Sequence, residues 1–132
     1  MKVADKITSI LCDDVREEAG NKYSLMGVYG ADLVFAQLPA LLPKLCVCIM
    51  LNNVRTDFRK GNVTVKLPET EPTQIPLEVS NNLIGQNITL FAVMVPFRAK
   101  SAGEARVEVR FAGDSKPSVV HKFQIKEAPK KQ

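Results

Sequence analysis

Residues 105–111, ARVEVRF, and residues 119–125, VVHKFQI, alternate apolar and polar side chains on both sides of the turn segment AGDSKP. Successive side chains of a strand point to opposite faces of its sheet, so a period of two indicates strands that bury one face. A short polar segment between two such runs is typical of a hairpin. We therefore expect an antiparallel hairpin with Val107, Val109, Phe111, Val119, His121, Phe123 and Ile125 facing inward and Arg106, Glu108, Arg110, Lys122, Gln124 and Lys126 facing water.

The rest of the chain repeats these short apolar runs, and no segment has an apolar stripe with helical spacing. Further strands are expected at residues 7–12, 23–28, 31–36, 45–51, 63–67, 75–79 and 88–97. Short strands with regular turns predict an all-β fold, an antiparallel β-sandwich of seven to nine strands, immunoglobulin-like or jelly-roll in type. We expect a single domain over residues 1–127 and a disordered basic tail over residues 128–132.

Composition narrows the classes of function. The 132 residues carry a net charge of +4, and half of this excess lies in the last seven residues, KEAPKKQ. The remaining charge is too small to favour nucleic acid as a partner. Three cysteines in apolar surroundings suggest reduced thiols, and the opening MKVADKITS has charges where a secretion signal needs an apolar core. We expect a cytoplasmic protein with no membrane segment.

Two predicted strands, 45–51 and 88–97, are apolar on both faces. The outer face of a strand in a sandwich normally meets water, so part of this surface needs a cover. Three interpretations are possible: the surface is covered by a second copy of the chain in a homodimer, by a crossing segment of the same chain, or by a different protein. The predicted assembly face consists of Val47, Ile49, Phe91, Val93 and Val95.

The densest group of charges lies between two apolar strands and includes Asp13, Asp14, Arg16 and Glu17. Adjacent residues of a strand point to opposite faces, so the two aspartates do not chelate one ion unless the strand has already ended. One interpretation is a turn at residues 17–22, with Arg16 paired to Asp14 or Glu18. The others are a partner-recognition surface, or a metal-binding or hydrolytic centre built on Asp13, Asp14 and Glu17.

Two further groups of residues are candidates for chemistry. Cys12, Cys46, Cys48 and His121 are of the residue types that form a four-ligand zinc site, but their spacing is not that of a zinc motif. We expect core thiols and a buried, hydrogen-bonded histidine, with no metal, no cofactor and no catalytic triad. The loop 52–62 holds Arg55, Arg59 and Lys60 around Phe58, which predicts either a solvated loop or a weak nucleic-acid contact.

The segment CDDVREEAGNKYSLMGVYG at residues 12–30, followed by the Leu-Pro elements at residues 38–45, resembles an uncharacterised family of small bacterial proteins. That family shares a Cys-Asp-Asp, Arg-Glu and Gly-Val-Tyr signature. The resemblance implies bacterial origin and a β-sandwich, and it transfers no activity, substrate or catalytic residue. Together these observations predict a non-enzymatic binding or assembly module that self-associates through a sheet face.

Overall fold

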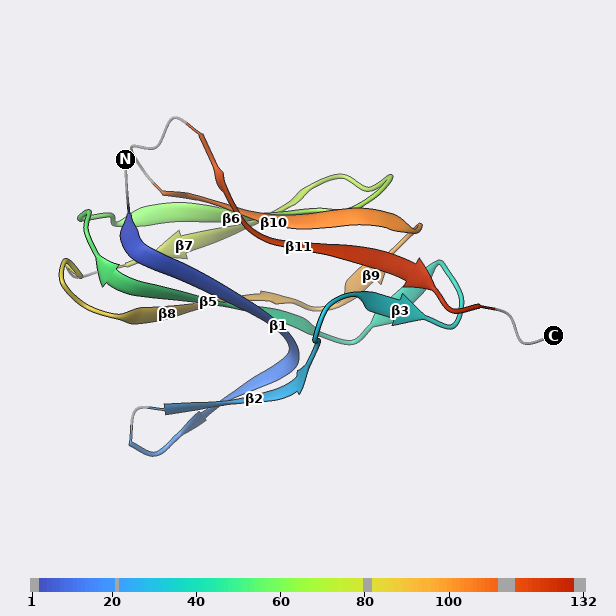
Figure 1. The fold of residues 1–132 in the computed structure, drawn as a ribbon, viewed down its shortest axis with the longest axis horizontal. Coiled ribbons are helices and arrows are strands. Elements are labelled where there is room, and N and C mark those ends of the chain that lie inside the picture. The colour runs from blue at the N-terminus through green and yellow to red at the C-terminus, as the bar shows by residue number, and fades with distance from the viewer. Residues whose placement is uncertain (1–2, 21, 80–81, 112–115, 130–132) are drawn as a thin grey trace.

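The protein is all-β. The computed structural model describes residues 3–20, 22–79, 82–111 and 116–129, and these residues form eleven strands and no helix (Figure 1). The strands are β1 (Ala4–Glu18), β2 (Lys22–Val28), β3 (Leu33–Phe35), β4 (Ala40–Leu42), β5 (Leu45–Val54), β6 (Lys60–Lys66), β7 (Thr73–Glu78), β8 (Ile88–Met94), β9 (Phe97–Ala99), β10 (Gly103–Phe111) and β11 (Ser118–Glu127). The first sheet has the order β2-β1-β5-β8 and the second sheet has the order β3-β11-β10-β6-β7, while β4 and β9 form a separate ribbon.

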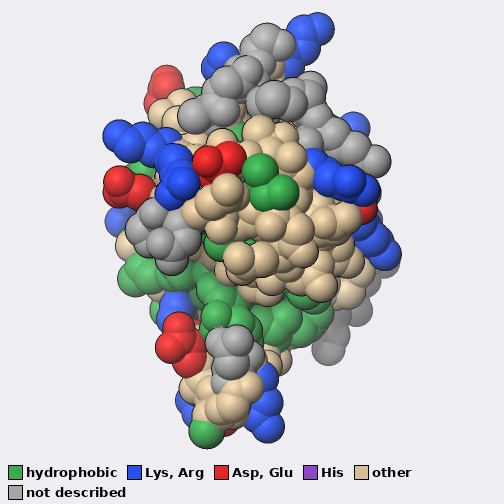
Figure 2. Space-filling model, turned by 90° about the vertical axis from the view of Figure 1, so that its left-hand side faces the viewer, with side chains coloured by type: hydrophobic (Ala, Val, Ile, Leu, Met, Phe, Trp, Pro, Cys, Tyr) green, Lys and Arg blue, Asp and Glu red, His purple; other side chains and the backbone are tan. Residues whose placement is uncertain are grey.

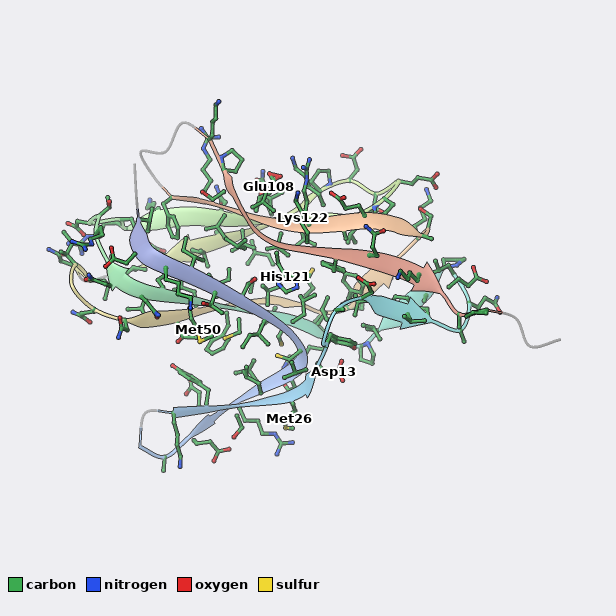
Figure 3. The ribbon with its side chains drawn as sticks, in the orientation of Figure 1. Asp13, Met26, Met50, Glu108, His121 and Lys122 are labelled. Carbon is green, nitrogen blue, oxygen red and sulfur yellow. The ribbon has the colours of Figure 1, made fainter. Side chains whose placement is uncertain are left out.

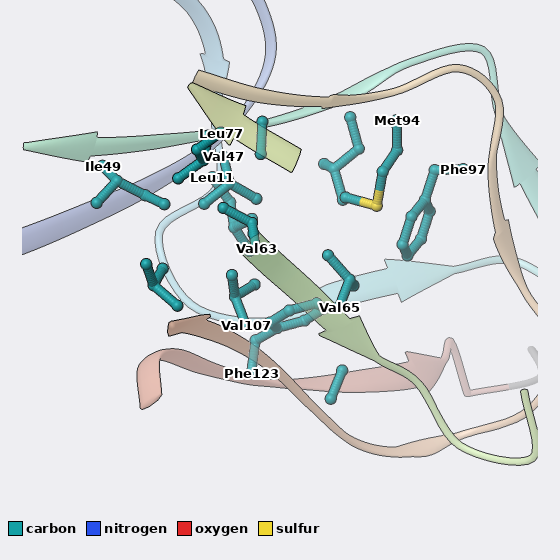
Figure 4. Close-up of a cluster of buried hydrophobic side chains, with 14 of the residues drawn as sticks. Leu11, Val47, Ile49, Val63, Val65, Leu77, Met94, Phe97, Val107 and Phe123 are labelled. Atoms are coloured by element: carbon teal, nitrogen blue, oxygen red, sulfur yellow. The ribbon is translucent and has the colours of Figure 1, made fainter. Parts of the chain in front are cut away.

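The hydrophobic core lies between the first and second sheets. Val47 and Ile49 of β5 are fully buried there, near Val63 of β6 and Val107 of β10 (Figure 4). Most of the surface that the core removes from water is aliphatic, which supplies the main driving force for folding. The prediction that Val47 and Ile49 belong to an outer assembly face is therefore wrong. The sequence pattern showed two apolar faces and did not say which residues of β5 point inward.

The outer face of the first sheet carries the other half of each apolar strand. Antiparallel pairing places Cys12 opposite Cys46, and it places Val93 on the other side of Cys46. Phe91 lies opposite Cys48 in the same way. Paired residues share a face, so these five side chains form one surface on the side of the sheet away from the core.

A segment of the same chain covers part of this outer face. The first half of β1 pairs with β5, whereas residues 12–18 pair with β2. The strand bends between these halves, so that the hairpin arm (residues 13–18 of β1 together with β2) lies beneath the first sheet (Figure 1). Tyr23 of the arm packs edge-on against Phe91 of β8, with ring centroids 4.8 Å apart. Hydrophobic side chains gather where the protruding arm meets the body (Figure 2).

The charged run belongs to this arm and not to a turn. β1 continues through Glu17 to Glu18 and β2 begins at Lys22, so the predicted turn over residues 17–22 is too long. Gly20, with φ of 85°, lies in the tighter turn between the strands. Charged side chains are tolerated in this strand because most of the arm extends into solvent.

The predicted hairpin of β10 and β11 is present, although the turn at residues 112–115 lies outside the described residues. An irregularity in the pairing at Val107 and Glu108 adds one residue, Val120, to β11. A bulge of this kind reverses which face the following side chains occupy. Val119 therefore lies opposite Glu108 and is exposed, and the prediction that Val119 faces inward is wrong.

Two more differences concern short strands. The run 88–97 divides at Val95 and Pro96 into β8 and β9, and β9 pairs with β4, a strand that was not predicted. β3 joins β11 in parallel, within a fold that is otherwise antiparallel. The predicted tail begins with Ala128, whose backbone N–H donates to the Phe35 carbonyl at 2.7 Å, while residues 130–132 lie outside the described residues.

Candidate functional site

The bend of β1 is built around the Asp13 side chain. The Tyr29 hydroxyl donates a hydrogen bond to Asp13 Oδ1, and the Tyr29 backbone N–H donates to the Leu11 carbonyl at 2.9 Å. Gly27 lies under the carboxylate, where an added Cβ would be 2.8 Å from Asp13 Cγ. Burial, followed by the bond to Asp13, raises the pKa of Tyr29 to about 12. The phenol therefore stays protonated at neutral pH and acts as a hydrogen-bond donor.

Asp14 points the other way and has a different partner. Lys44 Nζ, just before β5, donates to Asp14 Oδ1 at 2.6 Å, and the Val15 backbone N–H donates to the same oxygen at 2.9 Å. The hydrogen bond from Lys44 is the main reason that the pKa of Asp14 lies below its ordinary value. Among the described residues Arg16 forms no ion pair within 4.0 Å, so Lys44 takes the place that the sequence assigned to Arg16.

The carboxylates of the charged run thus diverge. Asp13 bonds Tyr29 at the bend (Figure 3), Asp14 bonds Lys44, and Glu17 lies further along the arm opposite Tyr23. Within the described ranges no group of three or more His, Cys, Asp or Glu side chains is placed to hold a metal ion. Asp13 and Asp14 are therefore held by separate partners on either side of the bend in β1.

The three cysteines are buried and none of them forms a disulfide. Burial, with a smaller contribution from the neighbouring thiols, raises the pKa of Cys12 to about 11. Burial also raises the pKa values of Cys46 and Cys48. The thiolate is the reactive form, so the raised pKa values make all three thiols poor nucleophiles at neutral pH.

His121 lies away from the cysteines and links the two sheets. It points from β11 toward β1, where its Nδ1 lies 2.7 Å from Ser9 Oγ (Figure 3). The Ser9 hydroxyl donates its single proton to the Val120 carbonyl, so His121 Nδ1 carries the hydrogen of the shared bond. Burial lowers the pKa of His121 below its ordinary value of 6.5, with partial compensation from a hydrogen bond with the Ser9 backbone. The imidazole is therefore uncharged at neutral pH.

The basic loop is largely neutralised by its neighbours. Arg55 makes a forked contact with Asp5, with Nε to Oδ1 at 2.7 Å and Nη2 to Oδ2 at 3.0 Å. Arg59 pairs with Asp57 at 3.1 Å. Phe58 is buried against Phe111 and offers no face on which a base could stack. Lys60 opens β6 opposite Glu78.

An exposed apolar surface lies at the end of β8. This strand is an edge of the first sheet; Val93 within it is 42% exposed, and Val95, the residue that follows it, is 69% exposed. There is no charged residue between Glu78 and Arg98. The structure therefore keeps Phe91, Val93 and Val95 of the predicted assembly face near the surface, although Tyr23 packs against Phe91.

Sequence reasoning missed two features. Glu108 is almost fully buried on the outer face of the second sheet, where Lys66 at 3.2 Å and Arg106 at 3.3 Å neutralise it. A groove of about 940 Å³ also opens beside the ribbon of β4 and β9, with Arg98 and Glu69 among its lining residues. No spacing rule joins residues 39–41, 69–71 and 98–100, so the groove could not be predicted from the sequence.

The described part of the chain has no helix that is long and apolar enough to cross a membrane. No curated protein and no solved structure was found to match this chain. A family model does match, over residues 7–114, which include the first sheet and most of the second. The chain belongs to this family, described as a family of unknown function (DUF6941).

Proposed function

We propose that this chain is a non-enzymatic assembly module that forms a homodimer through the exposed edge of β8. The supporting observation is an edge strand that lacks protection. Edge strands normally carry charges, proline or a short length that blocks pairing with another chain. β7 has Pro76 and Glu78, β3 has three residues, and β2 begins with Lys22. Among the described edge strands, β8 has none of these devices.

A second copy of the chain is the occupant that this edge fits best. A two-fold axis beside β8 places the strand antiparallel to its own copy, so that one surface serves both partners. The unpaired backbone groups of each edge then find partners, and the first sheet continues from one protomer into the other. Val93 and Val95 come together with their copies and leave water. The absence of charge on β8 avoids repulsion between identical strands.

The hairpin arm supports this arrangement from below. Its Tyr23 holds the Phe91 ring by an edge-on contact, so the middle of β8 is braced from within the protomer. Val93 and Val95 lie further along the chain and remain exposed. The same outer face thus has two covers: the arm over Phe91, and the second copy over the two valines.

Sedimentation equilibrium of the V93K and V95K variants tests the proposal. A lysine on the edge adds charge to both copies of the interface, so each substitution acts twice in a two-fold dimer. If each site contributes about 1 kcal/mol, the dissociation constant of the dimer rises by about 30-fold for a single variant. The wild-type chain is expected to be a dimer at micromolar concentration.

V119K is the matched control. Val119 is 44% exposed, close to the 42% of Val93, but it lies on β11 in the other sheet. We expect V119K to dimerise like the wild type. A wild-type chain that stays monomeric at high concentration contradicts the proposal. A V119K variant that dissociates while V93K does not would place the interface on the second sheet and would also contradict the proposal.

A further inference from the structure

The groove beside the ribbon of β4 and β9 has the size of a ligand site. Its volume of about 940 Å³ lies within the range of about 300–1,000 Å³ that is typical of small-molecule pockets. One wall is the ribbon, in which Leu41 lies directly opposite Arg98. The other wall is the loop that follows β6, residues 69–71. Pro39 and Leu41 give the groove an apolar part.

The charges in the groove are separated by sign. Arg98 and Lys100 flank the buried Ala99, so both cations leave β9 on the same side. Glu69 and Glu71 line the opposite wall. Within the described ranges none of these four side chains has an ion-pair partner within 4.0 Å. Opposite charges that line one groove without pairing leave both groups available to a ligand.

The loop that carries the carboxylates is held in place. Glu69 has a φ of 53°, in the left-handed region, and such strain persists only where the surroundings fix it. Thr70 Oγ1 donates to the Pro68 carbonyl at 3.0 Å. Gly103 packs so closely on Pro68 that an added Cβ would lie 3.0 Å from Pro68 Cγ. The acidic wall is therefore preorganised, which reduces the entropy lost on binding.

From this geometry we infer that the groove binds a zwitterionic molecule of short-peptide size. The ligand's carboxylate lies at Arg98 and Lys100, its ammonium group lies at Glu69 and Glu71, and its apolar part packs over Leu41. Carboxylates on one wall disfavour nucleic acid and other polyanions. The inference does not depend on the dimer, because β8 contributes no residue to the groove.

Nuclear magnetic resonance titration of the full ¹⁵N-labelled chain tests the inference, with the tripeptide Ala-Leu-Ala as the probe. At millimolar peptide we expect saturable shifts of the amide signals of residues 40–41, 69–71 and 98–100. The same peptide with an acetylated amino end and an amidated carboxyl end should bind at least about tenfold more weakly, because it has lost both charged ends.

Two variants assign the ends of the ligand. The double variant R98Q/K100Q should weaken the binding of peptides that have a free carboxylate and leave the binding of carboxamide peptides unchanged. The double variant E69N/E71Q should weaken the binding of peptides that have a free ammonium group and leave the binding of acetylated peptides unchanged. Asparagine replaces Glu69 because it tolerates the left-handed backbone at this position. K122Q, on β11, is the matched control and should bind like the wild type. The inference is overturned if no shifts occur in these segments, or if the blocked peptide binds equally well.

Discussion

The residue that most constrains the bend of β1 is Gly27. Both Gly27 and Gly20 have positive φ, 66° and 85°, but only Gly27 lies against another side chain, that of Asp13. We expect G20A to lower the free energy of unfolding by about 1 kcal/mol through backbone strain alone. G27A should lower it by about 2–3 kcal/mol, because the new Cβ also displaces Asp13 from Tyr29. Urea denaturation measures both values, and equal losses would show that the contact with Asp13 is unimportant.

His121 makes stability depend on pH in a defined window. Its pKa is lower in the folded protein than the ordinary 6.5, so the unfolded chain binds the extra proton first. Stability should therefore fall as the pH drops below 6.5, by at most about 1.4 kcal/mol per pH unit, and should be level above it. Denaturation from about pH 5 to about pH 8 should show this slope in the wild type and not in H121N. The pKa values of Asp14 and Asp32 are lowered from the ordinary 3.8, so these two residues change the stability at more acidic pH, outside this window. An identical slope in both proteins would remove the role of His121.

For single residues, the sequence predicted whether a side chain is buried better than it predicted which residue that side chain contacts. Buried thiols and a hydrogen-bonded His121 followed from their apolar neighbours, although His121 is half-buried and not buried as predicted. The partner of Asp14 did not, because Lys44 is thirty residues away in the chain and only the pairing of β1 with β5 brings it near. Val119 was misplaced because a bulge leaves no mark in the alternation of VVHKFQI.

The attachment of the hairpin arm to the rest of the first sheet can be tested by thiol labelling. The arm lies against the face of the sheet that carries the cysteines, where Cys46 Sγ is 3.8 Å from the Asp13 carbonyl, and the Tyr29 hydroxyl bonds Asp13 at the bend. We expect Y29F to open the arm more often and to raise the rate of thiol labelling by a disulfide reagent by about fivefold, the equivalent of about 1 kcal/mol. S24A, which removes a bond to Glu18 near the tip, is the control and should label like the wild type. Equal rates in Y29F and the wild type would mean that the arm does not gate the thiols.

Strand existence was predictable from the alternation, and strand ends were not. Each of the nine predicted runs contains a strand. The alternating runs bury one face in the way that period two requires, whereas β5 is buried on both faces. β1 ran past its predicted end because its charged half pairs with β2 in solvent. β4 was missed because three residues carry too little pattern. The parallel pairing of β3 with β11 depends on contacts far apart in the chain, which local pattern does not contain.

At the scale of the whole molecule, the all-β class followed from the sequence and the location of its accessible surfaces did not. The apolar run 88–97 correctly marked a strand with two apolar faces. Only the sheet order shows that this strand is an edge and that the arm covers part of its outer face. The groove likewise requires three distant segments to meet, so it becomes visible only in the fold.

Concentration-dependent hydrogen exchange detects whether β8 pairs with its own copy. Amides of Ile88–Met94 that point away from β5 should exchange freely in dilute protein and become protected in concentrated protein. Those of Thr73–Glu78 in β7, the edge strand with proline and charge, should exchange at the same rate in both. Exchange in β8 that does not change with concentration, or protection that develops in β7 instead, would contradict the account.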